Sequence, residues 1–300
     1  MSKKIQVPNN FKKSLIYSRG EEGKKWLDEL PDIVEKLSER WQLEIFSPFT
    51  LSYNYVCPVK RIDGSPAVLK LEFTTEKART EFEALKIFDG DGVVKILEED
   101  SGSKALLLER ALPGISLKSV KEDQKRTEIM IGIMKRLRKP APKKHELIFI
   151  EDWGKSFERH RKQFNGGTGP FKKYVFEKAE KTFFALAASQ KEKVLLHGDL
   201  HHGNILSAER EPFLAIDPKG IVGEAEYEVG AMLRNELPKN RAAAKKILDL
   251  RLDQLSVGLG YDRQRIKEWA FSQAMLAAVW VFEDHKKIDG PFLMCAELLA

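Results

Sequence analysis

The sequence of 300 residues is long enough for one large domain or for two lobes, and it is 42% apolar and 32% charged. These fractions exclude a wholly disordered chain. Basic residues exceed acidic ones by 51 − 45, which gives a formal net charge of +6. The basic residues are spread along the whole chain, with no basic segment interleaved with aromatic residues, so we expect no nucleic-acid partner.

The two cysteines, Cys57 and Cys295, are too few for a disulfide framework or a four-thiolate zinc site. The longest apolar run, residues 274–282, is too short to span a bilayer. The N-terminal residues lack the apolar stretch of a secretory signal. We therefore expect a cytoplasmic protein without a membrane partner, and the sequence carries no sign of its oligomeric state.

Apolar residues near the N-terminus recur at helical spacing and predict one buried helix face. Pro31 lies inside this pattern and is expected to divide the helix in two, because proline lacks a backbone N–H. The residues of the apolar stripe are Trp26, Leu30, Ile33, Leu37 and Trp41.

Strand-forming residues dominate residues 46–73, and the turn sequence DGSP at residues 63–66 predicts an antiparallel hairpin. A helix is predicted over residues 75–88, which glycines 90 and 92 bring to an end. Strands are predicted over residues 93–97 and 104–109. The first part of the chain is thus expected to be a small antiparallel sheet with one helix.

After Leu112-Pro113-Gly114 the pattern becomes mostly helical. The predicted helices cover residues 122–138, 171–190, 225–235, 240–257 and 262–286, and short strands are predicted at residues 194–196, 205–206 and 213–216. We expect an α+β protein with two lobes. Residues 1–110 are expected to form an N-lobe with a helical extension and the small sheet, and residues 111–300 a larger, mainly helical C-lobe.

The segment HGDLHHGN at residues 197–204 matches the kinase pattern H-x-D-L-x-x-x-N, with Gly198 in place of arginine. Asp217 follows Asn204 by thirteen positions, after an apolar strand. Phosphoryl transfer from ATP needs one carboxylate that orients the attacking hydroxyl and accepts its proton, and an amide oxygen and a second carboxylate that hold Mg²⁺. Asp199 is predicted to be the catalytic carboxylate, and Asn204 and Asp217 the Mg²⁺ ligands. A polar turn in which Asp199 caps nearby backbone is the alternative, and it leaves Asp217 unexplained.

Several segments together resemble the aminoglycoside phosphotransferase family, and within it the streptomycin 6-kinase-like branch of aminoglycoside/hydroxyurea antibiotic resistance kinases. The resemblance covers most of the chain. It implies a bilobal protein-kinase-like fold and ATP- and Mg²⁺-dependent transfer of phosphate to a hydroxyl of a small molecule such as streptomycin. The segments are HGDLHHGN (197–204), LAIDPKG (214–220), YEVG (227–230), WL and LP (26–31), NYV (54–56), VLK (68–70), and LER and PG (108–114).

The same resemblance implies a nucleotide site in the N-lobe. Lys70, at the end of a predicted strand, would contact the phosphates and needs a carboxylate from the following helix. Glu81 and Glu83 compete for this role, and we choose Glu81 because it shares a helix face with Ala78 and Leu85.

Two further nucleotide contacts are expected by analogy with kinases. Residues 106–111, including Glu109 and Ala111, are predicted to hold the adenine edge through their backbone. The turn at residues 51–55 stands where protein kinases have G-x-G-x-x-G, but it contains no glycine. Ser52 and Asn54, by side chain or backbone amide, are expected to cover the phosphates instead.

The departures from protein kinases favour a small acceptor. Gly198 stands where protein kinases have the arginine that pairs with a phosphorylated activation loop. Only nine residues separate Asp217 from the helix at Tyr227, which leaves little room for a segment that docks a peptide. A streptomycin-like acceptor carries guanidinium groups, which bind carboxylates. Glu228 is expected to brace the catalytic loop. The candidate acceptor ligands are Glu224, Glu226, Glu283 and Asp284.

Two other functions stay open at this stage. A metabolic kinase for a sugar, an amino alcohol or choline would use the same catalytic residues. A nucleotide-binding pseudokinase that acts through partners is opposed by the retention of Lys70, Asp199, Asn204 and Asp217.

Overall fold

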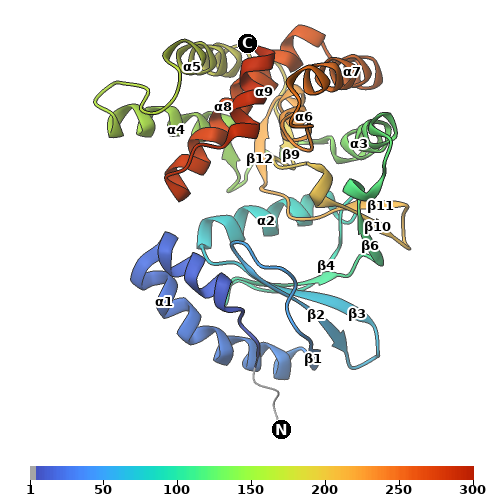
Figure 1. Cartoon of the computed structure of the whole chain (residues 1–300). Helices are drawn as coiled ribbons and strands as arrows, with labels where there is room; N and C mark the ends of the chain where they lie inside the picture. The colour runs from blue at the N-terminus through green and yellow to red at the C-terminus, as the bar shows by residue number, and fades with distance from the viewer. Residues whose placement is uncertain (1–4) are drawn as a thin grey trace. The chain divides into compact units, whose positions relative to one another are not determined.

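The computed structural model describes residues 5–300 (Figure 1). Contacts along the chain divide it into two compact units. Unit 1 contains the residues up to Gly90 together with Val94–Ala111, and unit 2 contains Asp91–Val93 together with Leu112–Ala300.

The described part of unit 1 is built on a five-stranded antiparallel sheet in the order β1-β2-β3-β5-β4. Tyr55, Cys57 and Val59 on β2 are buried and alternate with more exposed residues, as expected for a strand with one face on a core. The predicted hairpin is confirmed, with Gly64 at φ 85° in its turn. The strands are β1 Leu43–Ile45, β2 Tyr55–Arg61, β3 Pro66–Leu71, β4 Ile96–Asp100 and β5 Ala105–Glu109.

Helix α2 covers Thr75–Phe88 and confirms the predicted helix. Thr74 caps its first turn by accepting a hydrogen bond from the N–H of Lys77, and Asp89 ends it in the left-handed conformation. The predicted apolar face of α2 is buried, and so is Glu81.

Helix α1 covers Asn9–Arg40, and the prediction that Pro31 divides it is wrong. The helix continues through Pro31 and is interrupted at Gly20, where φ is 57° and ψ is −136°. Glycine reaches this conformation at low cost because it has no Cβ. Around Pro31, the burial of Leu27, Leu30 and Val34 in the core of unit 1 offsets the lost hydrogen bond.

The strand predicted over residues 93–97 begins later, because β4 starts at Ile96. Gly90 and Gly92 both have positive φ and turn the chain between them. Val93 belongs to unit 2, where it forms a parallel bridge with Ala215. Strand β5 confirms the next prediction to within one residue.

Within residues 112–300, unit 2 contains a sheet in the order β11-β10-β6 and a second in the order β7-β9-β12-β8. The three strands predicted here are confirmed as β9, β10 and β11. The other four strands, of two to four residues, were not predicted. The strands are β6 Pro113–Ser116, β7 Lys139–Pro140, β8 Ile148–Phe149, β9 Val194–Leu196, β10 Ile205–Ala208, β11 Phe213–Ala215 and β12 Ile221–Gly223.

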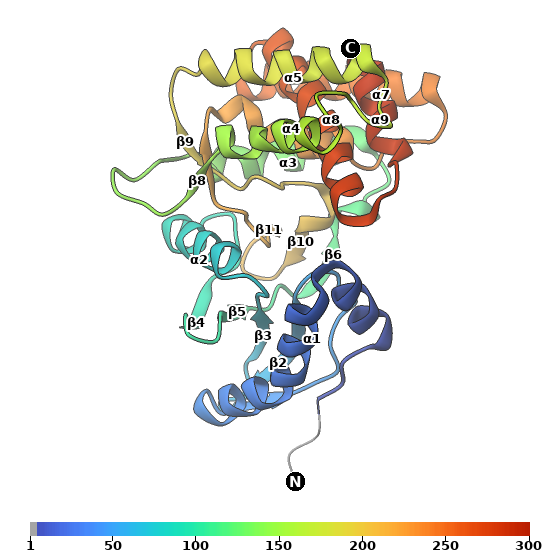
Figure 2. The ribbon, with the colours of Figure 1, turned by 90° about the vertical axis from the view of Figure 1, so that its left-hand side faces the viewer.

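Most helices of unit 2 pack around α8 (Figure 2). The residues of α8 from Ile266 to Val279 are mostly buried. Four predicted helices are confirmed as α3, α5, α7 and α8. The helix predicted over residues 225–235 divides into η3 and α6, and α4 and α9 were not predicted. The elements are η1 Leu117–Ser119, α3 Asp123–Leu137, α4 Ile150–Gln163, α5 Lys173–Ala188, η2 His202–Asn204, η3 Ala225–Glu228, α6 Val229–Arg234, α7 Arg241–Leu259, α8 Arg263–His285 and α9 Gly290–Leu299.

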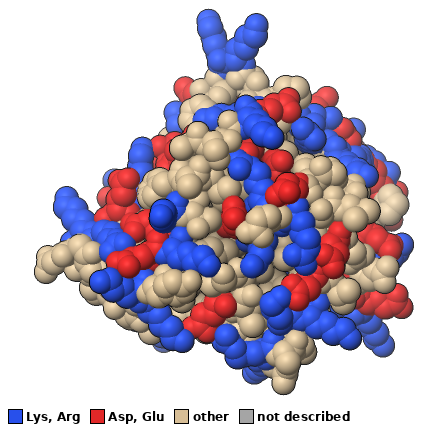
Figure 3. Space-filling view, turned by 90° about the horizontal axis from the view of Figure 1, so that it is seen from above, with Lys and Arg blue, Asp and Glu red and all other residues tan. Residues whose placement is uncertain are grey.

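No helix within residues 5–300 combines the length and the apolar character needed to cross a membrane. Acidic and basic side chains are interspersed over the face shown in Figure 3. The net positive charge is therefore not gathered on that face.

Candidate active site

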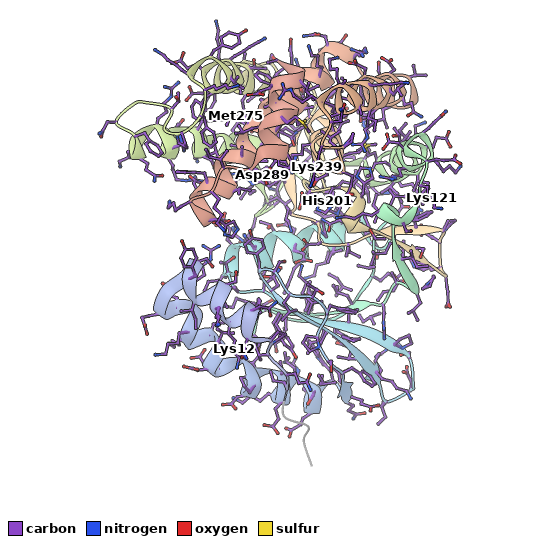
Figure 4. All side chains as sticks on the ribbon, in the orientation of Figure 1. Lys12, Lys121, His201, Lys239, Met275 and Asp289 are labelled. Atoms are coloured by element: carbon purple, nitrogen blue, oxygen red, sulfur yellow. The ribbon has the colours of Figure 1, made fainter. Side chains whose placement is uncertain are left out.

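Unit 2 brings together the backbone that carries the three residues predicted for catalysis and metal binding. Strands β10 and β11 pair with Ile205 opposite Ala215, and the N–H of Ile216 donates to the carbonyl of Asn204 at 2.9 Å. Asn204 therefore lies beside the residue that precedes Asp217. The side-chain Nδ2 of Asn204 donates to the backbone carbonyl of Asp199 at 3.0 Å. Figure 4 labels His201 on this loop, which we call the catalytic loop (residues 197–204).

His197 joins the catalytic loop to the segment that carries Asp217. Its Nδ1 accepts the N–H of Asp199 at 3.3 Å, its Nε2 lies 3.0 Å from the carbonyl of Ile216, and its own carbonyl accepts the N–H of Lys219 at 2.7 Å. Burial lowers the pKa of His197 to about 4. The ring is therefore neutral at pH 7, with its proton on Nε2 for the bond to Ile216.

Glu228 braces the catalytic loop, as predicted. Its carboxylate accepts the N–H of His197 at 2.6 Å and the N–H of Gly198 at 3.0 Å. Burial raises the pKa of Glu228 to about 7, although the two N–H donors act in the opposite direction. The two hydrogen bonds hold the backbone just before Asp199.

The glycine at position 198, where protein kinases have arginine, has a local structural reason. Its φ is 84°, and an added Cβ would lie 3.1 Å from Ile221 and 3.2 Å from Trp153. A side chain at this position would be strained by both the backbone conformation and the packing.

Arg234 contacts Asp199 and was not predicted. It lies on α6, is buried, and places Nη2 at 3.3 Å from Oδ1 of Asp199. Its Nη1 donates to Gln273 at 3.1 Å, and Gln273 donates to the carbonyl of Tyr227 at 2.5 Å. The sequence does hint at this contact, because Arg234 ends the apolar segment GAMLR (residues 230–234) and a buried cation needs an anionic partner.

Asp217 and His201 complete the surroundings of the loop. Asp217 has a φ of 63°, and its carboxylate pairs with the ammonium of Lys219. The Nε2 of His201 lies 3.8 Å from Oδ2 of Asp199, and burial lowers the pKa of His201.

In unit 1, Lys70 pairs with Glu81, with Nζ at 2.7 Å and 2.6 Å from its two carboxylate oxygens. The choice of Glu81 over Glu83 as the partner of Lys70 is confirmed. Lys70 also lies 3.0 Å from a second buried carboxylate, Glu72, which was not predicted. This contact could have been predicted, because side chains two positions apart on a strand, such as residues 70 and 72, point to the same face. Asn54 donates to the carboxylate of Glu72, and Ser52 is exposed.

Glu109 and Ala111 lie where unit 1 ends along the chain. Glu109 is the last residue of β5, and its Oε2 accepts the N–H of Lys95 at 2.9 Å while its own N–H donates to the carbonyl of Lys95 at 2.8 Å. Ala111 is half-buried. Their contact with a nucleotide stays a prediction.

The acidic residues predicted to bind an acceptor do not form one group. Glu224 is buried, and its two oxygens accept from Arg265 at 2.8 Å each and from the indole of Trp269. The Glu224 carboxylate is thus engaged inside unit 2, and its predicted contact with an acceptor stays a prediction. Glu226 lies in η3, whereas Glu283 and Asp284 lie near the end of α8, where Glu283 pairs with Arg159 at 3.3 Å.

Comparison with known sequences points to one family. The profile described as aminoglycoside/hydroxyurea antibiotic resistance kinase matches residues 41–285. A streptomycin 6-kinase of Streptomyces glaucescens is 32% identical over 94% of this chain and 93% of its own length. One of Streptomyces griseus is 31% identical over 99% and 97%. A hydroxyurea phosphotransferase of Kitasatospora aureofaciens is 30% identical over 93% and 81%.

Solved structures show the same fold at low sequence identity. A choline kinase LicA from Streptococcus pneumoniae superposes with a TM-score of 0.64 at 14% identity, over 91% of this chain and 97% of its own. A thermostable mutant of aminoglycoside phosphotransferase APH(4)-Ia gives 0.62 at 13% identity, over 88% and 97%. The predicted α+β, protein-kinase-like fold is confirmed.

Proposed function

Because the chain belongs to the aminoglycoside/hydroxyurea antibiotic resistance kinase family, we propose that it transfers phosphate from ATP, with Mg²⁺, to a hydroxyl of a small molecule. The membership confirms the resemblance and the enzyme class predicted from the sequence, a phosphotransferase with an alcohol group as acceptor. The proposal is supported above all by the gathering of Asp199, Asn204 and the Asp217 segment at one end of β10 and β11.

Asp199 acts on the acceptor. Its carboxylate orients the hydroxyl and takes its proton as the hydroxyl oxygen attacks the terminal phosphorus. Arg234 holds Oδ1 at 3.3 Å and offsets the carboxylate charge in a buried setting. His197 and Glu228 hold the backbone on which Asp199 sits.

The side chains of Asn204 and Asp217 fit Mg²⁺, because amide and carboxylate oxygens are the hard ligands that this cation binds. Nδ2 of Asn204 is engaged by the carbonyl of Asp199, which leaves Oδ1 as the ligand atom. Bound Mg²⁺ supplies positive charge that stabilises the phosphates. Lys219 orients the Asp217 carboxylate.

In unit 1, Lys70 binds the phosphates and Glu81 positions its ammonium. The turn with Ser52 and Asn54 covers the phosphates in place of a glycine-rich loop. The backbone around Glu109 and Ala111 binds the adenine edge.

We propose an aminoglycoside of the streptomycin type as acceptor, because two streptomycin 6-kinases match nearly the whole chain. Its cationic groups would bind Glu226, Glu283 and Asp284, and Arg159 must first release Glu283. A small neutral acceptor such as hydroxyurea is the second candidate. It is favoured by the internal pairing of Glu224 and by the hydroxyurea phosphotransferase among the relatives.

The purified protein is expected to release ADP from Mg²⁺-ATP with an acceptor in a panel of streptomycin, other aminoglycosides, hydroxyurea, choline and sugars. We expect Asp199→Ala to lower kcat by about 10²- to 10⁴-fold, because a general base contributes that much, with nucleotide binding retained. The control is Asp253→Ala, which removes an exposed carboxylate paired with Arg263. Turnover of Asp199→Ala close to that of the control would contradict the role of Asp199, and no turnover of the unmodified protein on any acceptor would favour a pseudokinase.

A further inference from the structure

Two buried carboxylates, Glu81 and Glu72, lie against the ammonium of Lys70, and only Glu81 was expected there. Glu81 accepts from Nζ at 2.6 Å and 2.7 Å, and Oε1 of Glu72 lies 3.0 Å away. The side chains of all three residues are at most 6% exposed. The formal charges of these three side chains, one ammonium and two carboxylates, sum to −1.

The Glu72 carboxylate has one engaged and one free oxygen. Oε1 receives Lys70 and the side-chain amide of Asn54. Oε2 is buried and has no hydrogen-bond partner among residues 5–300. Glu72 also lines a small pocket of unit 1 together with Asn54, Thr74 and Lys77. A buried carboxylate oxygen without a partner is costly, so it marks a place for a hydrogen-bond donor or a cation.

The position of Glu72 conflicts with the binding of a bare polyphosphate. Lys70 and Asn54 are the residues that the proposed function assigns to the phosphates, and both are held by Glu72. A nucleotide without a metal brings several negative charges toward a group that is already negative. A divalent cation on the phosphates removes two of those charges and accepts carboxylate oxygens as ligands.

We propose that Glu72 makes nucleotide binding depend on a divalent cation. Its carboxylate occupies Lys70 and Asn54 and repels the metal-free nucleotide, and Oε2 offers an oxygen ligand to the cation that accompanies the phosphates. This inference rests on the proposed function, and it assigns Glu72 to discrimination between metal-free and metal-bound nucleotide.

The test compares nucleotide affinity with and without metal. Dissociation constants for ADP and for a non-hydrolysable ATP analogue are measured by calorimetry in excess Mg²⁺ and in EDTA. For Glu72→Gln we expect about tenfold tighter binding in EDTA and equal or weaker binding in Mg²⁺, because one negative charge is removed near the phosphates. The preference for Mg²⁺-nucleotide therefore falls by at least about tenfold.

Two control variants separate this role from a general charge effect. Glu72→Asp keeps the negative charge and is expected to keep the preference of the unmodified protein. Glu83→Gln removes a carboxylate from the half-buried side of α2 and is also expected to keep it. Glu72→Ala, which removes the same charge with a smaller side chain, takes the place of Glu72→Gln if that variant does not fold.

The inference is overturned if Glu72→Gln keeps the same preference for Mg²⁺-nucleotide, or if Glu83→Gln loses it equally. In both cases the unmodified protein still binds nucleotide, and the proposed function stands. Absence of nucleotide binding by the unmodified protein in Mg²⁺ would overturn the proposed function as well.

Discussion

Two buried titratable side chains, His197 and Glu228, hold the backbone that presents Asp199. His197 accepts the N–H of Asp199, and Glu228 accepts the two N–H groups that precede it. Burial disfavours the charged form of each side chain. It therefore lowers the pKa of His197 to about 4 and raises the pKa of Glu228 to about 7. A neutral ring and a carboxylate with two donors therefore set the geometry of the loop.

Glu228→Gln tests this support. One end of the carboxamide is an NH₂ group, so one backbone N–H loses its acceptor and meets a donor. We expect the free energy of unfolding to fall by about 2 kcal/mol and kcat to fall with little change in nucleotide affinity. Urea denaturation and steady-state kinetics measure the two effects. Glu226→Gln, on the same turn, serves as the control for stability only, and equal stability of the two variants would contradict the bracing role.

The same variant has a pH signature. Between pH 4.5 and about 7, the folded protein keeps a proton on Glu228 that the unfolded chain releases. The contribution of this group to stability therefore decreases as pH rises through that interval. Glu228→Gln is expected to lack this decrease in urea denaturation measured across the interval, and an unchanged pH profile would show that Glu228 does not carry it.

At the scale of elements, Arg265 and Glu224 fasten the first turns of α8 to the rest of unit 2. Arg265 donates to both oxygens of Glu224 at 2.8 Å and to the carbonyl of Ser189, which follows α5, at 3.2 Å. Trp269, one turn further along α8, donates to the same carboxylate. The pair therefore joins α8, the end of α5 and the segment before η3.

Glu224→Ala is expected to cost about 3 kcal/mol of unfolding free energy, because it leaves Arg265 without its buried anionic partner. The folded Glu224→Ala variant is expected to have the same KM for the acceptor as the unmodified protein, because the Glu224 side chain is buried in the interior. Glu226→Ala is expected to change stability by less than about 0.5 kcal/mol. A raised acceptor KM in Glu224→Ala without a loss of stability would restore Glu224 as an acceptor ligand.

At the scale of the whole molecule, buried histidines make stability sensitive to acid. His160, His197 and His202 are fully buried, and burial lowers the pKa of each, to about 4 for His197 and about 3 for His202. Below pH 6.5 the unfolded chain binds protons on these rings that the folded protein excludes. Stability therefore falls as pH falls from 6.5 toward 4, and the raised pKa of Glu228 offsets part of this loss.

His160→Phe isolates one ring far from the catalytic loop in sequence. His160 packs among Phe164, Phe171 and Phe176, so phenylalanine fits the site, although the contact of Nε2 with the carbonyl of Thr168 is lost. Between about pH 7.5 and about pH 5, we expect the variant to lose less unfolding free energy than the unmodified protein, by at most about 1.4 kcal/mol per pH unit.

The control for this variant is Phe171→Leu, which disturbs the same cluster without a titratable group. It is expected to lower stability equally at both pH values in urea denaturation. Equal acid sensitivity of His160→Phe and the unmodified protein would mean that the pKa of His160 is the same in the folded and unfolded states.

Much of the secondary structure could be predicted from patterns of neighbouring residues. Helix α2, the β2–β3 hairpin and strands β9 to β11 follow from residue periodicity and turn residues, because these act between neighbours in the sequence. The same periodicity was enough to choose Glu81 over Glu83 as the partner of Lys70. The catalytic motif needed only its spacing and the strand before Asp217.

Other features depend on contacts between distant segments. Pro31 is tolerated within α1 because Leu30 and Val34 are buried on the core of unit 1. Helix α4 packs Ile150, Gly154 and Phe157 toward the interior and contacts α5 and α8; these residues recur at helical spacing, which the prediction overlooked.

The residue sequence alone determined which chemical groups are available and how they are spaced along each local element, and that was sufficient to assign a kinase-type loop and a lysine–glutamate pair. The tertiary structure decided how the charged groups are used. Arg234 contacts Asp199, 35 positions away in the sequence. Arg265 pairs with Glu224, 41 positions away. The physical reason is that a buried charge must find a partner in space, and packing of remote segments decides which partner it meets.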